Sequence, residues 1–173
     1  MSEKVLTINE PLATIGDRII AYIIDFFIMQ LGALVCDLLV LIIWGIMAAI
    51  DAGPATINDD AYVIVLSAVA VIGVLIWMGF DIYYLVFWLA KHEGQSIGKK
   101  KRNIRIMIIE DESSGKIRKM TNKDIGIVLF RLIFTIVDAF FFFLVGLYLM
   151  NSDPNHQRFA DKQAKTVVIS EAK

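Results

Sequence analysis

The sequence contains little of what disulfide-bonded, metal-binding and nucleic-acid-binding proteins use. One cysteine, Cys36, and two histidines occur among 173 residues, which excludes a disulfide within the chain and a cysteine-based metal site. The 17 basic and 18 acidic residues nearly balance, so a strongly basic face for nucleic acid is not expected. The histidines, His92 and His156, are isolated and form no catalytic or metal-ligand pattern. We therefore expect no cofactor, no metal, no nucleic-acid partner and no enzymatic activity.

Charge is also scarce, at 20% of residues, while 57% of residues are hydrophobic. A water-soluble domain usually has about 45–50% apolar residues, so the excess indicates segments inside a bilayer. Three stretches, 19–50, 61–90 and 125–150, are each longer than the roughly 20 apolar residues that cross a bilayer as a helix. The sequence therefore predicts an all-α polytopic membrane protein, a single domain over residues 1–173, with long transmembrane helices at about 12–50, 60–91 and 122–150.

The basic residues indicate how these helices are oriented. Residues 51–60 contain no lysine or arginine and three aspartates, whereas residues 91–123 contain ten basic residues. Lysine and arginine near helix ends stay on the cytoplasmic side of a membrane. We therefore expect residues 51–60 outside, a basic cytoplasmic segment at 92–121, and a cytoplasmic amino terminus.

The third apolar stretch leaves two alternatives open. A single crossing by residues 125–150 places the polar tail, residues 151–173, outside the membrane, although that tail contains four basic residues. A broken or re-entrant helix near Asp138 instead returns the tail to the cytoplasm, and such a fold is tolerated at membrane depth when protein or water covers it. We take three crossings as the default and leave the side of the tail open.

The basic cytoplasmic segment has a strand-like pattern. Isoleucines alternate with other residues over 104–108, and a turn-like stretch follows, which together predict a short β-hairpin between the second and third helices. The apolar run 167–169 would add a third strand only if the tail is cytoplasmic. After the hairpin, Thr121 and Asp124 have the spacing of a capping box that opens a helix.

Charged side chains inside the apolar stretches are the strongest functional signal. The carboxylates are Asp25, Asp37, Asp81 and Asp138, and the cationic candidates are Arg18 and Arg131. A carboxylate at the centre of a bilayer costs roughly 2.5–3.5 kcal/mol, so it is normally paired, protonated or facing water. We expect Asp25 to have its partner on another helix, with Arg131 or a protonated Asp81 as the neighbour. The structural alternative is that Arg18 reaches the membrane boundary and that Asp25 and Arg131 form an ion pair that only stabilises the fold.

Three segments carry a resemblance to a known family. They are Ala13–Asp25, with Arg18 and Asp25; Glu93–Lys99, with Gly94, Gln95, Gly98 and Lys99; and Gln157–Val168, with Asp161. Together they make the chain similar to the RDD family of small bacterial and archaeal membrane proteins. That family is named for an arginine at the start of its first helix, an aspartate in the same helix and a second aspartate elsewhere. The resemblance assigns these positions to Arg18, Asp25 and Asp161.

The resemblance implies a multi-pass protein of the prokaryotic cytoplasmic membrane, with transport of ions or small solutes as its suspected role. We expect ion or proton-coupled solute transport, with candidate pathway residues Arg18, Asp25, Asp81, Arg131, Asp138 and Asp161. The alternative is a non-catalytic accessory or scaffold subunit of a larger membrane complex. The expected partners are the lipid bilayer, further copies of the chain or a larger membrane complex, and anionic lipid at the basic run Lys99, Lys100, Lys101 and Arg102.

Overall fold

The computed structural model describes residues 8, 10–51, 59–140 and 144–171, without the side chains of residues 51, 59, 60 and 136–140. The chain divides into two compact units, which are described separately below. The first unit contains the residues up to Asp25 and those from Tyr84 onward, and the second is Phe26–Tyr83. Most of the predicted outer segment, residues 51–60, lies outside the described residues.

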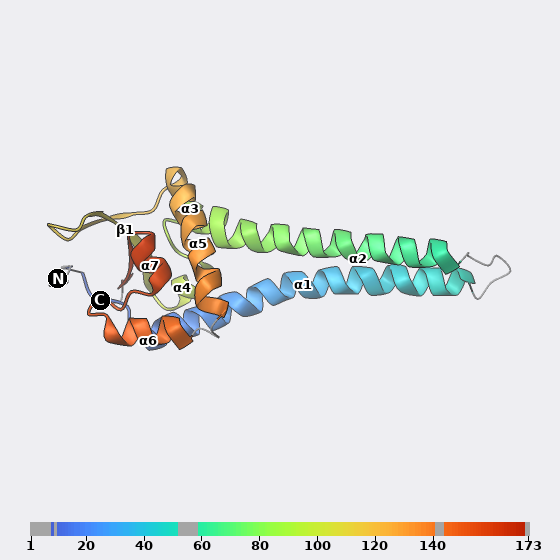
Figure 1. Ribbon diagram of the computed structural model, residues 1–173, viewed down its shortest axis with the longest axis horizontal. Helices are drawn as coiled ribbons and strands as arrows, with labels where there is room; N and C mark the ends of the chain where they lie inside the picture. The colour runs from blue at the N-terminus through green and yellow to red at the C-terminus, as the bar shows by residue number, and fades with distance from the viewer. Residues whose placement is uncertain (1–7, 9, 52–58, 141–143, 172–173) are drawn as a thin grey trace. The chain divides into compact units, whose positions relative to one another are not determined.

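Two long apolar helices form the second unit. Helix α1 (Ile15–Asp51) begins in the first unit, and helix α2 (Asp59–Ile82) runs beside its later part (Figure 1). A Cβ atom at Gly32 would lie 2.7 Å from the ring of Phe80, so the absence of a side chain at this position lets the two helices approach closely.

Both helices are long and apolar enough to cross a membrane. The candidate spans are Ile15–Ile50, with 36 residues, and Ala61–Lys91, with 31. Only 11% and 6% of the residues in their most apolar stretches are buried, which is unlike the core helix of a water-soluble domain. Large side chains such as Phe27, Leu31 and Ile64 are exposed. An apolar surface of this extent fits a membrane protein.

A three-stranded antiparallel sheet lies in the first unit. Strand β1 (Ile104–Asp111) pairs with β2 (Lys116–Lys119) on one side and with β3 (Thr166–Ser170) on the other. The predicted hairpin is therefore confirmed, and the tail supplies the third strand. The chain is mostly helical, as expected, and the β-structure extends beyond the predicted hairpin by one strand. Three strands pack a two-sided apolar core that a lone hairpin would lack.

The amino-terminal segment joins the same sheet. Leu12 forms an antiparallel bridge with Ile169, and the backbone N–H of Ala13 donates to the carbonyl of Val168 at 3.0 Å. Three distant parts of the chain, the start, the basic segment and the tail, therefore lie in one hydrogen-bonded layer. Whatever side of a membrane one of them occupies, the other two share it.

Short helices surround the sheet. The π-helical turn η1 (Tyr83–Trp88) and helix α3 (Leu89–Lys91) lead into α4 (Ile97–Lys101), and the 3-10 turn η2 (Asn122–Asp124) precedes α5 (Ile125–Phe140), α6 (Leu144–Ser152) and α7 (Phe159–Gln163). The core between them contains Val86, Ile104, Ile106, Met120, Val128 and Val168. The predicted capping box at the start of this helical region is present, because the Asp124 carboxylate accepts from the backbone N–H of Thr121 at 2.8 Å.

The expectation of a third membrane crossing at 122–150 needs correction. Among the described residues a third membrane-spanning helix is not shown, and α5 and α6 run in different directions (Figure 1). A single crossing by residues 125–150 would also place β1 and β3 on opposite sides of the bilayer, yet these two strands are paired. The alternative of a broken helix, with the tail on the same side as the basic segment, agrees with this pairing.

Candidate functional site

A buried carboxylate surrounded by arginines is the centre of the first unit. Asp161, on α7, is fully buried. Arg131, on α5, donates from Nε to Asp161 Oδ1 at 2.8 Å, and Arg18, on α1, lies 3.4 Å from Oδ2. The backbone N–H of Arg158, the residue that caps α7, also donates to Oδ2 at 3.2 Å. One aspartate therefore joins α1, α5 and α7.

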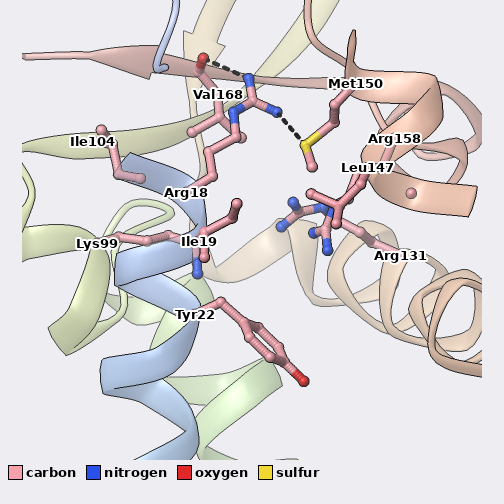
Figure 2. A pocket seen from close by; sticks show the side chains of 11 residues that line it. Arg18, Ile19, Tyr22, Lys99, Ile104, Arg131, Leu147, Met150, Arg158 and Val168 are labelled. Atoms are coloured by element: carbon pink, nitrogen blue, oxygen red, sulfur yellow. Dashed lines mark hydrogen bonds between the residues drawn. The ribbon is translucent and has the colours of Figure 1, made fainter. Parts of the chain in front are cut away.

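Arg18 also joins the helices to the tail strand. Its guanidinium donates to the backbone carbonyl of His156 at 2.6 Å and to that of Val168, on β3, at 3.1 Å. Its remaining contact is with the sulfur of Met150, on α6, at 4.0 Å (Figure 2). Because Arg18 contacts three elements from the end of the chain, it fixes the tail against the first turn of α1.

The surroundings of Asp161 keep it ionised. Burial alone raises the pKa of a carboxyl group, but the charges of Arg131, Arg158 and Arg18 outweigh it and lower the pKa of Asp161 from 3.8 to about 2. A second carboxylate in the unit behaves similarly, because paired hydrogen bonds from Arg118 lower the pKa of Asp124 well below its ordinary value. Both groups are therefore anionic across the physiological pH range.

A second buried carboxylate, Asp25, has a different set of partners. It accepts hydrogen bonds from the hydroxyls of Tyr84 at 2.6 Å and Ser96 at 2.5 Å, and from the backbone N–H of Gly98 at 2.8 Å. The ammonium of Lys99 lies 3.4 Å away. Tyr84 reaches this position from the π-helical turn η1, a distortion that is frequent at functional sites.

The glycines of the segment Glu93–Lys99 are needed for close approach. A Cβ atom at Gly98 would lie 2.1 Å from the carbonyl oxygen of Ala21 and 2.8 Å from Asp25 Oδ1. Gly94 has φ +85°, a left-handed conformation that favours glycine, and a Cβ there would lie 2.2 Å from the carbonyl oxygen of Ile106. Only glycine lets α4 reach α1 and lets the preceding turn lie against β1.

Polar contacts fix the same segment to the end of the chain. Gln95 donates to the side chain of Glu171 at 2.7 Å and to the carbonyl of Ile104 at 3.3 Å. Arg105, on β1, pairs with both Glu171 and Glu93 at 2.5 and 3.0 Å. The segment Glu93–Lys99 is therefore joined to α1 through Asp25 and to the tail through Gln95.

A cavity of about 250 Å³ lies between these elements. Its lining residues are Arg18, Ile19, Tyr22, Lys99, Ile104, Arg131, Gly146, Leu147, Met150, Arg158 and Val168. Figure 2 shows the guanidinium ends of Arg131 and Arg158 close together, with Arg18 on the side of Val168 and Met150. Lys99 connects the two carboxylate clusters, since it contacts Asp25 and also lines this cavity.

A family model, described as RDD family, matches residues 12–165. The chain belongs to the RDD family. This match includes the first two segments described above and the third as far as Lys165, and it covers most of the chain. Comparison with curated proteins and with solved structures gives no match. The three residues assigned to the family name therefore have positions in a fold: Arg18 and Asp161 form an ion pair, and Asp25 is the centre of a neighbouring hydrogen-bonded cluster.

The structure brings together most of the predicted site residues, but not in the predicted pairs. Arg18, Arg131 and Asp161 form one cluster, and Asp25 forms another with the motif residues Gly98 and Lys99. The expectation that Asp25 has a partner on another element is confirmed. The two partners named for it, Arg131 or a protonated Asp81, were wrong, because Asp25 binds Tyr84 and the motif instead, and Arg131 pairs with Asp161.

The two remaining predicted site residues are Asp81 and Asp138. Asp81 lies on α2 in the second unit, half-buried, and its Oδ1 is a buried atom without a hydrogen-bond partner among the described residues. The side chain of Asp138 lies outside the described residues, although its backbone belongs to α5. The hydrogen bonds described for Asp25 and Asp161 do not include Asp81.

Sequence reasoning missed three residues of the site, namely Tyr84, Ser96 and Arg158. Ser96 precedes the helix Ile97–Lys101 directly, which is the position of a helix cap and was a usable signal. Arg158 lies three residues before Asp161, a spacing that places two side chains on one helical face. Tyr84 had no such signal. Within the described chain, histidine, cysteine and acidic side chains do not gather in threes that would hold a metal ion.

Proposed function

We propose that the protein is an integral membrane protein of the prokaryotic cytoplasmic membrane in which α1 and α2 each cross the bilayer once. The exposed apolar surface of both helices supports this, together with membership of the RDD family. The ten basic residues at 91–123 favour a cytoplasmic position for the first unit, with the amino terminus and the tail beside the sheet. The segment between α1 and α2 is then on the opposite side.

The exposed and buried side chains of α5 and α6 support a position in which both helices enter the bilayer from the cytoplasmic side without crossing it. On α5 the buried face carries Arg131, while Leu129 and Ile133 are exposed. On α6 the large side chains Leu144 and Tyr148 are exposed. A helix of a water-soluble protein has its apolar side chains toward the core and its charged side chains outside, so α5 has the reverse arrangement. Two short helices in the membrane boundary leave the tail in the cytoplasm.

We propose ion or proton-coupled solute transport as the function, with Asp81 as the group that takes up and releases the proton or cation. The observation that supports this is the buried Asp81 Oδ1, which has no hydrogen-bond partner among the described residues although α2 is a candidate membrane span. Asp25 and Asp161 are already held by several donors. An unsatisfied carboxylate within a membrane is unstable as an anion, so it exchanges a proton or binds a cation.

Two crossings enclose too little space for a pathway, so this function requires several copies of the chain. Exposed apolar side chains on α1 and α2, such as Leu38 and Leu75, supply the surface for such contacts. The proposed oligomer has its pathway between copies, beside Asp81. It involves no enzymatic step.

We expect Asp81→Asn to abolish proton or cation flux while leaving the protein folded, because the amide has no ionisable group. The full chain is purified, placed in vesicles and followed with a pH-sensitive dye while an ion gradient is applied. Glu112→Gln is the control, since Glu112 is an exposed carboxylate outside both candidate spans. Native flux from the Asp81→Asn chain would refute the assignment of the carrier.

A second candidate is an accessory or scaffold subunit of a larger membrane complex. The hydrogen bonds that Asp25 and Asp161 accept favour the accessory role, because carboxylates with several fixed donors hold a structure together. If the native chain gives no flux with any ion gradient, the transport proposal is wrong. Mass measurement of a gently solubilised complex would then identify a partner present in fixed proportion.

A further inference from the structure

The cavity in the first unit has an excess of positive charge. Among the residues whose side chains the structure describes, four cationic side chains and no carboxylate line it, and the four are Arg18, Lys99, Arg131 and Arg158. Asp161 is shared by the three arginines, and Asp25 is paired with Lys99. One carboxylate therefore faces three guanidinium groups. Buried cations without a matching anion are costly, so the site favours an anionic ligand.

Several donors at this cavity are not used. Arg18 has a side chain only 8% exposed, and its buried Nε has no partner among the described residues. The single ion pair of the Arg158 guanidinium within the described chain is with Asp161, and it is long, at 3.8 Å. The ammonium of Lys99 donates to Asp25 at 3.4 Å and to Ser96 at 3.0 Å, which leaves its third N–H without a partner among the described residues, and burial lowers the pKa of Lys99 to about 8. These three groups are placed to donate to a further anion.

The rest of the cavity lining is apolar. Ile19, Tyr22, Leu147 and Met150 line it beside the cations. Ile19 and Tyr22 are also partly exposed on the surface of α1. A ligand that fits both parts has an anionic group and an apolar chain.

The cavity also lies at a suitable depth along α1. Arg18 and Tyr22 follow Ile15, where the candidate span begins, by about 5–10 Å at the rise of an α-helix. The polar headgroup layer occupies about 5–7 Å on each side of the hydrocarbon core. The guanidinium groups are therefore at the level of lipid phosphates when α1 crosses the bilayer.

We propose that this cavity binds the phosphate of an anionic phospholipid from the cytoplasmic leaflet. Arg158, Arg18 and Lys99 donate to the phosphate oxygens, and an acyl chain lies along Ile19, Tyr22 and Leu147. Arginine is suited to this contact because its planar group donates to two oxygens at once. This site differs from the exposed basic residues Lys100 and Lys101, and it does not depend on transport.

Native mass spectrometry of the detergent-purified full chain tests the proposal. The chain is titrated with phosphatidylglycerol and, separately, with phosphatidylcholine, and inorganic phosphate is added as a competitor. We expect phosphatidylglycerol to bind at least about tenfold more tightly than phosphatidylcholine, and inorganic phosphate not to displace it. Displacement by inorganic phosphate, or equal binding of the two lipids, would overturn the assignment to an anionic lipid.

Two variants locate the binding. Arg158→Gln removes the guanidinium whose ion pair with Asp161 is long, and it should weaken phosphatidylglycerol binding by about tenfold. The matched control Lys101→Gln changes an exposed position and should leave phosphatidylglycerol binding unchanged. Leu147→Trp fills the cavity while keeping every charge, and should weaken binding similarly. If Arg158→Gln does not fold, Leu147→Trp decides. Native affinity in the folded cavity variants, or an equal loss in Lys101→Gln, would refute the site.

Discussion

Replacing Asp161 with asparagine should destabilise the protein by about 3–5 kcal/mol, which is a large part of the stability of an ordinary domain. The carboxylate is fully buried, and its loss leaves Arg18, Arg131 and Arg158 without their shared anion. Thermal unfolding of the detergent-purified chain measures the change. Glu112→Gln is the control, because the Glu112 ion pair with Lys165 is exposed and worth only about 0–1 kcal/mol.

A second substitution and a pH series make this prediction more specific. Arg131→Gln in the Asp161→Asn chain should restore part of the lost stability, because it removes one of the buried cations that the Asp161 carboxylate neutralises in the native chain. The pKa of Asp161 is lower in the folded chain than its ordinary 3.8, so its stabilising effect is complete above about pH 4 and is lost as the pH falls toward about 2. The variant should lack this part of the acid dependence. Native stability in Asp161→Asn would contradict the structural role of the cluster.

Replacing Gly98 with alanine should have a comparable effect. The new Cβ would lie 2.1 Å from the carbonyl oxygen of Ala21, so α4 must move away from α1. That movement also breaks the hydrogen bond from the Gly98 N–H to Asp25. Overpacking costs about 1–3 kcal/mol, and a lost hydrogen bond to a buried charge costs about 1.5–3 kcal/mol more.

Gly126→Ala is the matched control for this prediction. A Cβ at Gly126, on α5, meets no atom within 4 Å, and alanine favours a helix over glycine by about 0.5–1 kcal/mol. The control should therefore be as stable as the native chain or slightly more stable. Equal melting temperatures for Gly98→Ala and Gly126→Ala would show that α4 does not pack closely on α1.

Local patterns in the sequence were sufficient for several features. The alternation over 104–108 predicted the hairpin, and the Thr121 to Asp124 spacing predicted the capping box. Both depend on residues close together in the chain. The need of Asp25 for a partner on another element also followed from the cost of an isolated buried carboxylate. These inferences required no knowledge of how distant segments pack.

The identity of the partners did not follow from the sequence. Asp25 pairs with Tyr84, 59 residues away, and with Lys99, 74 residues away. The cost of burying a charge says that a partner exists, but packing between elements decides which one it is. Arg131 was chosen as the partner of Asp25 because it has the opposite charge. In the fold, however, α7 places Asp161 next to Arg131, and these two residues form the ion pair. The apolar run 167–169 indicated a third strand only on the condition that the tail is cytoplasmic, and the structure shows that it pairs with β1.

A third membrane-spanning helix, which the default of three crossings requires, is not shown among the described residues, and the reason is related. Residues 125–150 are apolar and long enough to span a bilayer, but length and composition do not give the direction of a helix. The four basic residues of the tail were the better signal, since they agree with the pairing of β1 and β3. Charge near the ends of a segment was more informative here than its hydrophobic length.

Side-specific cysteine labelling in intact cells tests most directly whether the start, the basic segment and the tail share one side of the membrane. Single cysteines are placed at Thr56, Ser113 and Gln163 in a chain with Cys36→Ser, and each is treated with a membrane-impermeant reagent before and after permeabilisation. We predict labelling of Thr56 in intact cells, and labelling of Ser113 and Gln163 only after permeabilisation. Labelling of Gln163 but not Ser113 in intact cells would contradict the account, because β1 and β3 could not then pair across the membrane.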